Sequence, residues 1–412
     1  MNKTLSSLLL ELPVPFKQVD GILHVEAQAY NGISRWLDNF DCISLCAPLL
    51  PASADESSEG SMTWLPVTEL LSSGRLKLHP LPWGYHPMEH FKHQSKVAQL
   101  FRRLIPEHRY LCFSNLGWLG SWGNIAADEA SRAQRPYAVW LDWVLHEMPD
   151  ANPGGVAKRA FGRIKLSMLK RNSLRAVRNA ALGLFHGNSV HQAYAPYCRQ
   201  AQIVHDIHLK RSDLIDEAGL QARLTRGDGL LRIGYAGRVH AMKGPLQWID
   251  ALAQAIRGGP AGLHIEATWI GDGPLLDAAR SRVRELGLQE QIHFPGVEND
   301  RARVLAFLRS LDLFLFCHLT PESPRCLIEA LMSGVPLLGY ASPYAHDLVA
   351  ASSQAGCFVP VGQSAELGEL LRRQCSSTEL GERSRAAQRC GSAFSDEAVF
   401  RQRSDLIKAH LP

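Results

Sequence analysis

Short apolar segments alternate with helical patterns in the second half of the chain, and this alternation most constrains the fold. The apolar segments are four to seven residues long, and the stretches between them repeat apolar residues at helical spacing. Alternation of this kind predicts a parallel β-sheet with helices on both faces. Ligands of such sheets bind beyond the carboxyl ends of the strands, so the loops there are the candidate site. The predicted strands are 231–235, 264–270, 291–294, 313–317 and 336–339.

The first half shows the same alternation less regularly. At 412 residues the chain is long enough for two domains. The segment 209–229 is charged and poor in aromatic residues, which indicates an interdomain connection. The predicted strands of the first half are 6–12, 42–48, 110–114, 137–143 and 182–187.

Composition narrows the class of protein. A net charge of +4 is too small to indicate nucleic acid as the main partner. Nine cysteines, odd in number and scattered, indicate reduced thiols in a cytoplasmic protein. The N-terminal apolar run is interrupted by Glu11 and two prolines, which does not fit a signal peptide.

The first candidate motif is GYAGRVHAMKG, residues 234–244, at the end of a predicted strand. Gly237 allows a tight turn, and Arg238 and Lys243 follow five residues apart. Two cations directed at one point can hold a diphosphate and stabilise the charge that develops as it leaves. The alternative is that both are solvated loop cations.

The second motif is TPESPRCLIEALMSGVPLLGY, residues 320–340, where a helix begins after an apolar strand. Pro324 suits the first helical turn, and Glu329 one turn later is placed to accept hydrogen bonds from a ribose diol. Glu322, ahead of the helix, is placed to meet a sugar hydroxyl. The alternative makes Glu322 a charge favoured by the helix dipole and Glu329 an exposed helix acid. The amides predicted to face an anion are those of Arg325, Cys326 and Leu327.

Together with IGDGPLLDAARSRVRELGLQEQIHFPGV, residues 270–297, these motifs resemble, in order and spacing, the carboxyl-terminal domain of family 4 retaining glycosyltransferases of the GT-B fold. The resemblance implies an α/β fold of two Rossmann-like, doubly wound domains that face a central cleft. It also implies an acceptor-binding domain of residues 1–208, to which a last helix, 396–412, crosses back. Residues 209–395 would form the donor-binding domain.

The resemblance also assigns residues. The family's Arg and Lys on the donor diphosphate match Arg238 and Lys243, and its ribose-binding Glu matches Glu329. Its sugar-contacting Glu is expected eight residues before Glu329, where Pro321 stands, and Glu322 lies seven before. The chain thus departs from the pattern by one residue. The region around Val297 corresponds to the place where the base binds.

In the first domain, family members often carry a His at the end of a middle strand. Here the strand end is Asp142, with His146 four residues on. Either side chain is a candidate to orient an acceptor hydroxyl. The alternative is that Asp142 caps a helix and His146 is an ordinary core or surface histidine. The segment 27–32 resembles the flexible loop after the first strand, which in the family approaches donor and acceptor.

A basic segment begins at Lys158 and ends at Arg178. It holds eight basic residues and no acidic one, with apolar residues at helical spacing. A helix of this kind suits an anionic membrane surface. The alternative is a core-packing helix with a solvated basic face. Because no nucleic-acid motif accompanies it, nucleic acid is not an expected partner.

The sequence therefore predicts a glycosyltransferase that moves a sugar from a nucleotide donor to an acceptor hydroxyl, with retention and without a metal ion. The donor, a UDP- or GDP-sugar, is a substrate, and no cofactor is expected. The acceptor is a glycan or a lipid-linked glycan, and the protein is cytoplasmic, peripheral on the inner face of the membrane. Rival interpretations are a nucleotide-sugar epimerase, a non-catalytic sugar-nucleotide binding protein and a membrane-surface or nucleic-acid adaptor.

Overall fold

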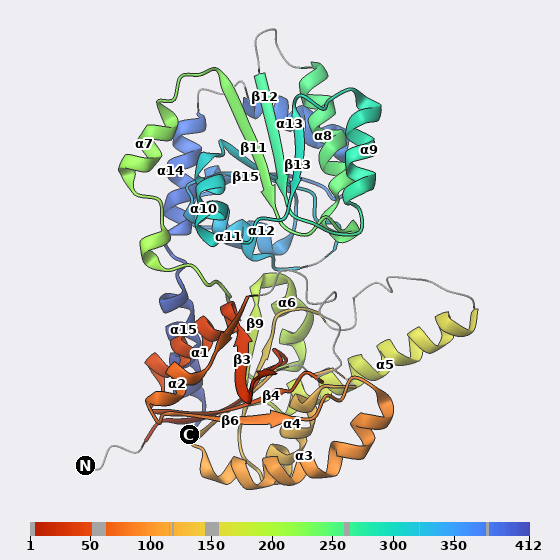
Figure 1. Cartoon of the computed structure of the whole chain (residues 1–412), viewed down its shortest axis with the longest axis vertical. Helices are drawn as coiled ribbons and strands as arrows, with labels where there is room; N and C mark the ends of the chain where they lie inside the picture. Colours follow the sequence, from red (N-terminus) through yellow and green to blue (C-terminus); the bar gives the residue numbers. More distant parts are fainter. Residues whose placement is uncertain are drawn as a thin grey trace. The chain divides into compact units, whose positions relative to one another are not determined.

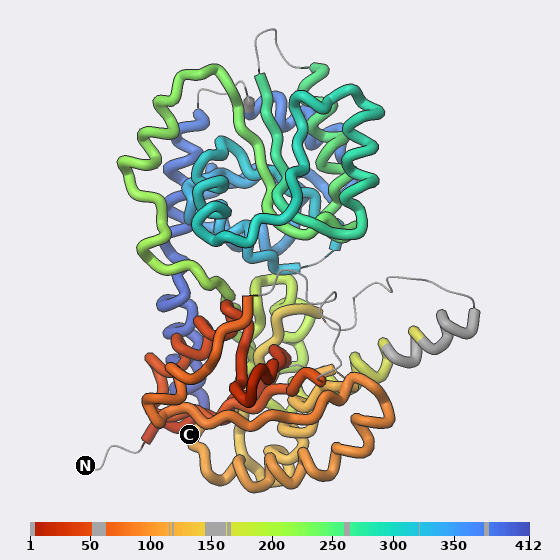
Figure 2. The backbone as a smooth tube through the Cα atoms, in the orientation of Figure 1, coloured from red at the N-terminus to blue at the C-terminus, as the bar shows by residue number. Residues whose placement is uncertain are grey.

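The chain forms two compact α/β units, Met1–His208 with Asp396–Pro412 and Leu209–Ser395. The structure is a computed structural model, shown as a cartoon in Figure 1 and as a backbone trace in Figure 2. It describes residues 5–51, 63–114, 116–117, 119–144, 156–258, 264–320, 322–375 and 379–412.

The first unit is built on a seven-stranded parallel sheet in the order β10-β9-β8-β7-β1-β4-β6. The chain winds from the central β1 outward to β6, then returns and winds through β7 to β10 on the other side. Right-handed crossovers in opposite directions place helices on opposite faces, so the sheet is doubly wound. The strands are β1 (Ser7–Glu11), β4 (Cys42–Pro48), β6 (Leu76–Leu81), β7 (Tyr110–Phe113), β8 (Ala138–Leu141), β9 (Leu182–His186) and β10 (Ala201–Val204).

The structure confirms the five strands predicted in this half and adds the two edge strands. β6 was missed because its sequence, LKLHPL, mixes polar residues and Pro80 into a short run. A proline is tolerated there because one side of an edge strand needs no ladder hydrogen bond. The helices of the unit are α1 (Ala27–Asn39), α2 (Thr68–Ser72), α3 (Pro87–Glu107), α4 (Trp122–Arg132), α5 (Val156–Asn179), α6 (Gly187–Tyr194) and α15 (Asp396–His410).

The expectation of a flexible loop over 27–32 is wrong, because these residues begin helix α1. The helix directly follows β3 (Ile22–Glu26), the middle strand of a small antiparallel sheet with β2 (Lys17–Val19) and β5 (Trp64–Pro66). The carboxylate of Glu26 caps it, accepting hydrogen bonds from the amides of Gln28 at 2.9 Å and Ala29 at 3.2 Å. These bonds satisfy two of the amides that a helix start leaves without partners, and so fix the segment as a helix.

The last helix, α15, belongs to the first unit. Its Arg403 is fully buried and donates to the carbonyl of His205 at 3.0 Å and to Oδ1 of Asp206 at 2.9 Å. The guanidinium also lies over the rings of Phe400 and Trp140, at 4.1 and 4.4 Å from their centroids. A buried cation needs such partners, so this contact fixes the end of the chain against the loop after β10.

The second unit has a six-stranded parallel sheet in the order β13-β12-β11-β14-β15-β16. The five predicted strands are confirmed: β11 (Leu230–Ala236), β12 (His264–Ile270), β13 (Ile292–Gly296), β14 (Leu313–Phe316) and β15 (Leu337–Tyr340). The short edge strand β16 (Gly356–Val359) was missed. The helices are α7 (Glu217–Leu224), α8 (Pro245–Gly258), α9 (Leu276–Leu286), α10 (Arg301–Ser310), α11 (Arg325–Met332), α12 (Pro343–Leu348), α13 (Ser364–Cys375) and α14 (Leu380–Gly391).

The winding of this sheet reverses between β11 and β14. The chain proceeds from β11 to β13 on one side and from β14 to β16 on the other, so the loops after β11 and β14 separate at the reversal. Such a point opens the crevice in which doubly wound sheets bind ligands. Across the described ranges, no helix combines the length and the apolar composition needed to cross a membrane.

Candidate functional site

The loop after β11 is held close to the end of β14. It contains a single 3₁₀ turn, Ala241–Lys243, followed by Gly244 in the left-handed conformation, with φ +64°. A Cβ at Gly244 would collide with the carbonyl oxygen of Cys317. Only glycine permits both the turn and this close approach of two backbones. The approach places Lys243 against the loop that follows β14.

Replacing Gly244 with alanine is expected to displace this loop and to lower both the melting temperature and nucleotide affinity. Gly287→Ala is the matched control, because Gly287 has φ +71° with open space around its Cβ position. Alanine in the left-handed region costs about 1 kcal/mol at either site. Any larger loss at Gly244, measured by thermal unfolding, reports the collision with Cys317. Equal losses in the two variants would show that the close approach is unimportant.

Lys243 and Glu322, predicted from separate motifs, meet in the structure. Nζ of Lys243 lies 2.6 Å from Oε2 of Glu322. The side chains are only 10% and 18% exposed, so this ion pair is largely desolvated. It lies at the switch point between β11 and β14, in the crevice that the topology predicts.

A buried tyrosine–histidine pair lies next to Glu322. The hydroxyl of Tyr235 lies 2.8 Å from Nε2 of His318, and Nδ1 of His318 lies 3.8 Å from Oε1 of Glu322. Burial, and then the charge of Lys243, hold the pKa of His318 well below its usual value, while burial raises the pKa of Tyr235. Both are therefore neutral near pH 7. The tyrosine hydroxyl and Nε2 share one hydrogen bond, and either atom can be its donor.

Sequence reasoning missed His318, although it lies directly after the predicted strand 313–317, in a loop where function was expected. Only its position after a strand could have identified it from the sequence, because a single histidine in an apolar context is more often structural.

The start of α11 differs from the prediction. Pro324 is the N-cap residue, and the helix begins at Arg325. The amide of Leu327 donates to the carbonyl of Pro324 at 3.2 Å, so it does not face an anion as predicted. The amides of Arg325 and Cys326 precede it in the first turn, where an α-helix has no intrahelical acceptors. Burial raises the pKa of the Cys326 thiol to about 12, which leaves it protonated.

Glu329 is neither exposed nor isolated. Its side chain is 14% exposed, and Oε1 accepts a hydrogen bond of 2.8 Å from Arg301, the first residue of α10. Sequence reasoning missed Arg301.

By contrast, Arg238 is exposed on the loop after β11 and enters none of the ion pairs formed by the described residues. Gly237, beside it, is half-buried, and Val297 is exposed directly after β13.

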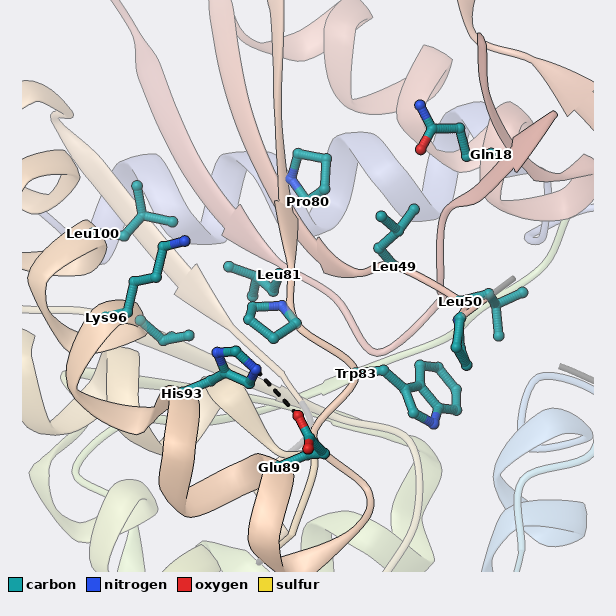
Figure 3. Close-up of a pocket in the computed structure, with 13 residues that line it drawn as sticks. Gln18, Leu49, Leu50, Pro80, Leu81, Trp83, Glu89, His93, Lys96 and Leu100 are labelled. Carbon is teal, nitrogen blue, oxygen red and sulfur yellow. Dashed lines mark hydrogen bonds and ion pairs between the residues drawn. The ribbon is translucent and has the colours of Figure 1, made fainter. Parts of the chain in front are cut away.

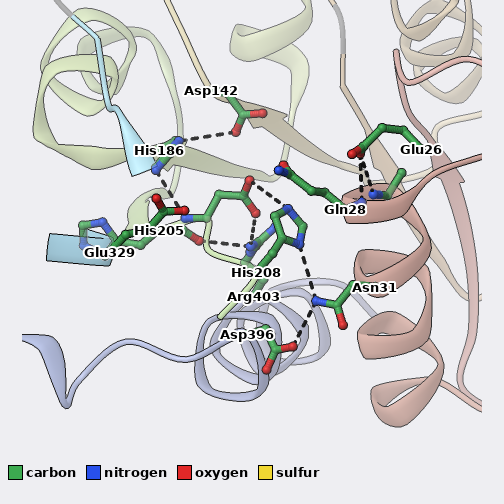
Figure 4. Close-up of polar contacts among 12 residues, drawn as sticks. Glu26, Gln28, Asn31, Asp142, His186, His205, His208, Glu329, Asp396 and Arg403 are labelled. Atoms are coloured by element: carbon green, nitrogen blue, oxygen red, sulfur yellow. Dashed lines mark hydrogen bonds and ion pairs between the residues drawn. The ribbon is translucent and has the colours of Figure 1, made fainter. Parts of the chain in front are cut away.

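In the first unit, Asp142 directly follows β8, as predicted, and its side chain is half exposed. Figure 4 shows it facing His186, the last residue of β9, whose Nδ1 lies 3.8 Å from Oδ1 of Asp142. Nε2 of His186 accepts a hydrogen bond of 3.2 Å from the amide of Asp206. The ring proton therefore lies on Nδ1 and faces Asp142. Sequence reasoning missed His186, which is the last residue but one of the predicted strand 182–187.

Other predictions for the first half remain open. His146 lies outside the described residues. The basic segment is helical, within α5, but the side chains of Lys158, Arg159, Arg163 and Lys165 also lie outside the described part.

Comparison with known families decides the class of the second unit. Residues 220–389 match the family described as glycosyl transferases group 1. This segment is a group 1 glycosyltransferase domain. The chain is 32% identical over 127 residues to the Vi polysaccharide biosynthesis protein VipC/TviE of Salmonella typhi. It is 31% identical over 140 residues to a 2-deoxystreptamine N-acetyl-D-glucosaminyltransferase of Streptomyces fradiae. These matches cover 31% and 33% of the chain, and 19% and 31% of the two relatives.

Solved structures extend the similarity to the whole fold. The Anabaena protein Alr3699/HepE in complex with UDP and glucose aligns with a TM-score of 0.64 at 17% identity, over 98% of this chain and 100% of its own. WaaG, a glycosyltransferase involved in lipopolysaccharide biosynthesis, aligns with a TM-score of 0.62 at 15% identity, over 97% and 99%. Both sheets of the chain thus have counterparts in these structures, which confirms the predicted GT-B fold of two Rossmann-like domains.

Proposed function

We propose that the chain is a retaining glycosyltransferase that moves a sugar from a nucleotide-sugar donor to an acceptor hydroxyl in polysaccharide or glycolipid synthesis. The observation that carries the proposal is the desolvated Lys243–Glu322 pair, which lies at the switch point of a group 1 glycosyltransferase domain. The names of the relatives and the UDP-glucose complex of the Anabaena protein support a role in transfer from such donors.

The donor would bind in the second unit. Arg238 and Lys243 hold its diphosphate and stabilise the charge on the departing nucleotide. Glu329 accepts from the ribose, and Glu322 contacts the transferred sugar. Because two cations supply positive charge at the leaving group, we propose transfer without a metal ion. The amides of Arg325 and Cys326 add donors for an anion, and Val297 lies in the region of the base.

The acceptor would bind in the first unit. Asp142 accepts a hydrogen bond from the acceptor hydroxyl and orients it, and His186 positions Asp142 through its Nδ1 proton. The basic helix α5 would hold the protein at an anionic membrane surface, on the cytoplasmic side.

Turnover with a panel of sugar nucleotides tests the proposal. UDP-, GDP-, ADP- and dTDP-sugars are first ranked by the rise they cause in melting temperature, since ligand binding stabilises the folded state. The best binder is then assayed for release of free nucleotide. An epimerase would convert the sugar without releasing nucleotide, and a non-catalytic protein would bind without turnover. The anomeric configuration of the product, by NMR, tests retention, and activity in a chelator tests metal independence.

His186→Gln is expected to lower kcat for transfer about tenfold and to leave donor affinity unchanged, because glutamine cannot reproduce the orientation of the ring proton toward Asp142. Steady-state kinetics that separate kcat from the donor KM provide the measurement. In an Asp142→Asn background the same substitution should have little further effect, since the two residues act as one unit. Independent, multiplicative effects would assign His186 a structural role only.

A further inference from the structure

A pocket of about 750 Å³ lies in the first unit, apart from the residues assigned to the acceptor hydroxyl. Figure 3 shows four sources for its lining: helix α3, the end of β6 with the residues after it, the loop after β4, and Gln18 of β2. α3 contributes Glu89, His93, Lys96 and Leu100, which repeat at helical spacing along one face. The pocket therefore lies at the carboxyl ends of β4 and β6, on the edge of the sheet where ligands bind.

The sheet order separates this pocket from Asp142. Asp142 follows β8, whereas β4 and β6 lie three and four strands away across the sheet. At about 4.8 Å between neighbouring strands, the separation is roughly 14 to 19 Å. A ligand in the pocket thus lies too far from Asp142 to present the reacting hydroxyl. An extended acceptor can reach both positions, with its reacting hydroxyl at Asp142 and a remote part in the pocket.

The walls of the pocket are mainly apolar. Leucines and prolines form most of the lining, and Trp83 adds an aromatic ring to it. Trp83 is itself held by Tyr85, with ring centroids 4.5 Å apart. Such a surface favours hydrocarbon over a hydroxylated sugar, because burial of apolar groups drives binding and unpaired hydroxyls oppose it.

One uncompensated cation faces this apolar surface. Glu89 is engaged by His93 at 3.2 Å and by Lys92 at 3.5 Å. Lys96 is exposed and enters none of the ion pairs of the described residues. Its amine is directed toward the pocket in Figure 3. An anion beside an apolar chain would complement this arrangement.

We propose that this pocket binds the apolar, anionic end of an extended acceptor, an alkyl or polyprenyl phosphate joined to the acceptor glycan. The hydrocarbon lies along the leucines and Trp83, and the phosphate pairs with Lys96. This assignment rests on the proposed function, because it requires that the first unit bind an acceptor. It adds that the enzyme recognises the lipid end of that acceptor, far from the hydroxyl that reacts.

Binding of three probes to the full chain tests the assignment. Decyl phosphate, used below its critical micelle concentration, has both an alkyl chain and an anionic phosphate. Decyl glucoside has only the alkyl chain, and inorganic phosphate has only the anion. Calorimetry should show decyl phosphate binding at least tenfold more tightly than either. Lys96→Ala should weaken decyl phosphate about tenfold and leave decyl glucoside unchanged. Leu50→Asp should weaken both alkyl probes by tenfold or more, while Lys77→Ala, an exposed lysine on β6 outside the pocket, should change nothing.

Two results would overturn the inference: equal affinity for the phosphate and glucoside probes, or probe binding that Leu50→Asp leaves intact. Melting temperature and nucleotide affinity of each variant report on folding and on the donor site. If donor turnover is present in all variants while the probes fail, only the lipid-phosphate assignment is wrong. If no donor is bound or turned over by the unaltered protein, the proposed function itself fails.

Discussion

Replacing Lys243 with methionine is expected to lower the rate of sugar transfer by about 10²- to 10³-fold. In the proposed function Lys243 stabilises the charge on the departing diphosphate, and loss of one such preorganised group has an effect of this size. The variant also leaves Glu322 in a largely desolvated position without its cation. Breaking a buried pair in this way costs about 3 to 5 kcal/mol of stability. Both effects are measurable, one by initial rates and the other by denaturant unfolding.

The two effects separate in the double variant Lys243→Met with Glu322→Gln. A neutral amide removes the uncompensated carboxylate, so stability should return most of the way to that of the unaltered protein. Activity should not return, because no cation replaces Lys243. Lys210→Met, an exposed lysine of the same unit, is the control for general loss of positive charge. Recovery of transfer in the double variant would remove Lys243 from the catalytic role and leave the pair as a structural contact.

The sequence predicted the central strands because each is a continuous apolar run bounded by polar turns. It missed β6 and β16 because edge strands are buried less completely and carry mixed sequences, and a short run with Pro80 has no strong periodicity. The switch points depend on the order of strands in space, which pairing across the sheet determines. Local pattern alone does not encode that order.

In the candidate site too, the sequence indicated some residues and missed others. The sequence indicated Lys243 and Glu322 because their motifs carry chemistry at strand ends, yet their 2.6 Å contact joins residues 79 positions apart. His318, His186 and Arg301 were missed because each acts through a neighbour that only the fold supplies. Their shared signal is a place at or just after a strand end, or at a helix start. Residues of this kind can be identified only when the fold shows which predicted site residue each of them contacts.

Glu329→Gln is expected to weaken nucleotide binding tenfold or more and to remove discrimination between ribose and 2′-deoxyribose. A carboxylate that accepts hydrogen bonds from both ribose hydroxyls contributes about 1.5 to 3 kcal/mol for each charged bond, and an amide contributes less. Calorimetry with the preferred nucleoside diphosphate and its 2′-deoxy analogue measures this directly. The unaltered protein should prefer the ribose form by about tenfold, and the variant should bind both alike.

Arg301→Gln distinguishes recognition of the ribose from simple pairing between α10 and α11. Arg301 donates to Oε1 of Glu329, which leaves Oε2 for a ligand and holds the carboxylate in place. Its loss should therefore weaken binding of the ribose nucleotide only a few fold and preserve the preference for ribose. If Glu329→Gln keeps that preference while both variants lose stability equally, the acid serves only the ion pair. The ribose would then be bound elsewhere in the domain, and the second motif would retain Glu322 alone as a ligand-binding acid.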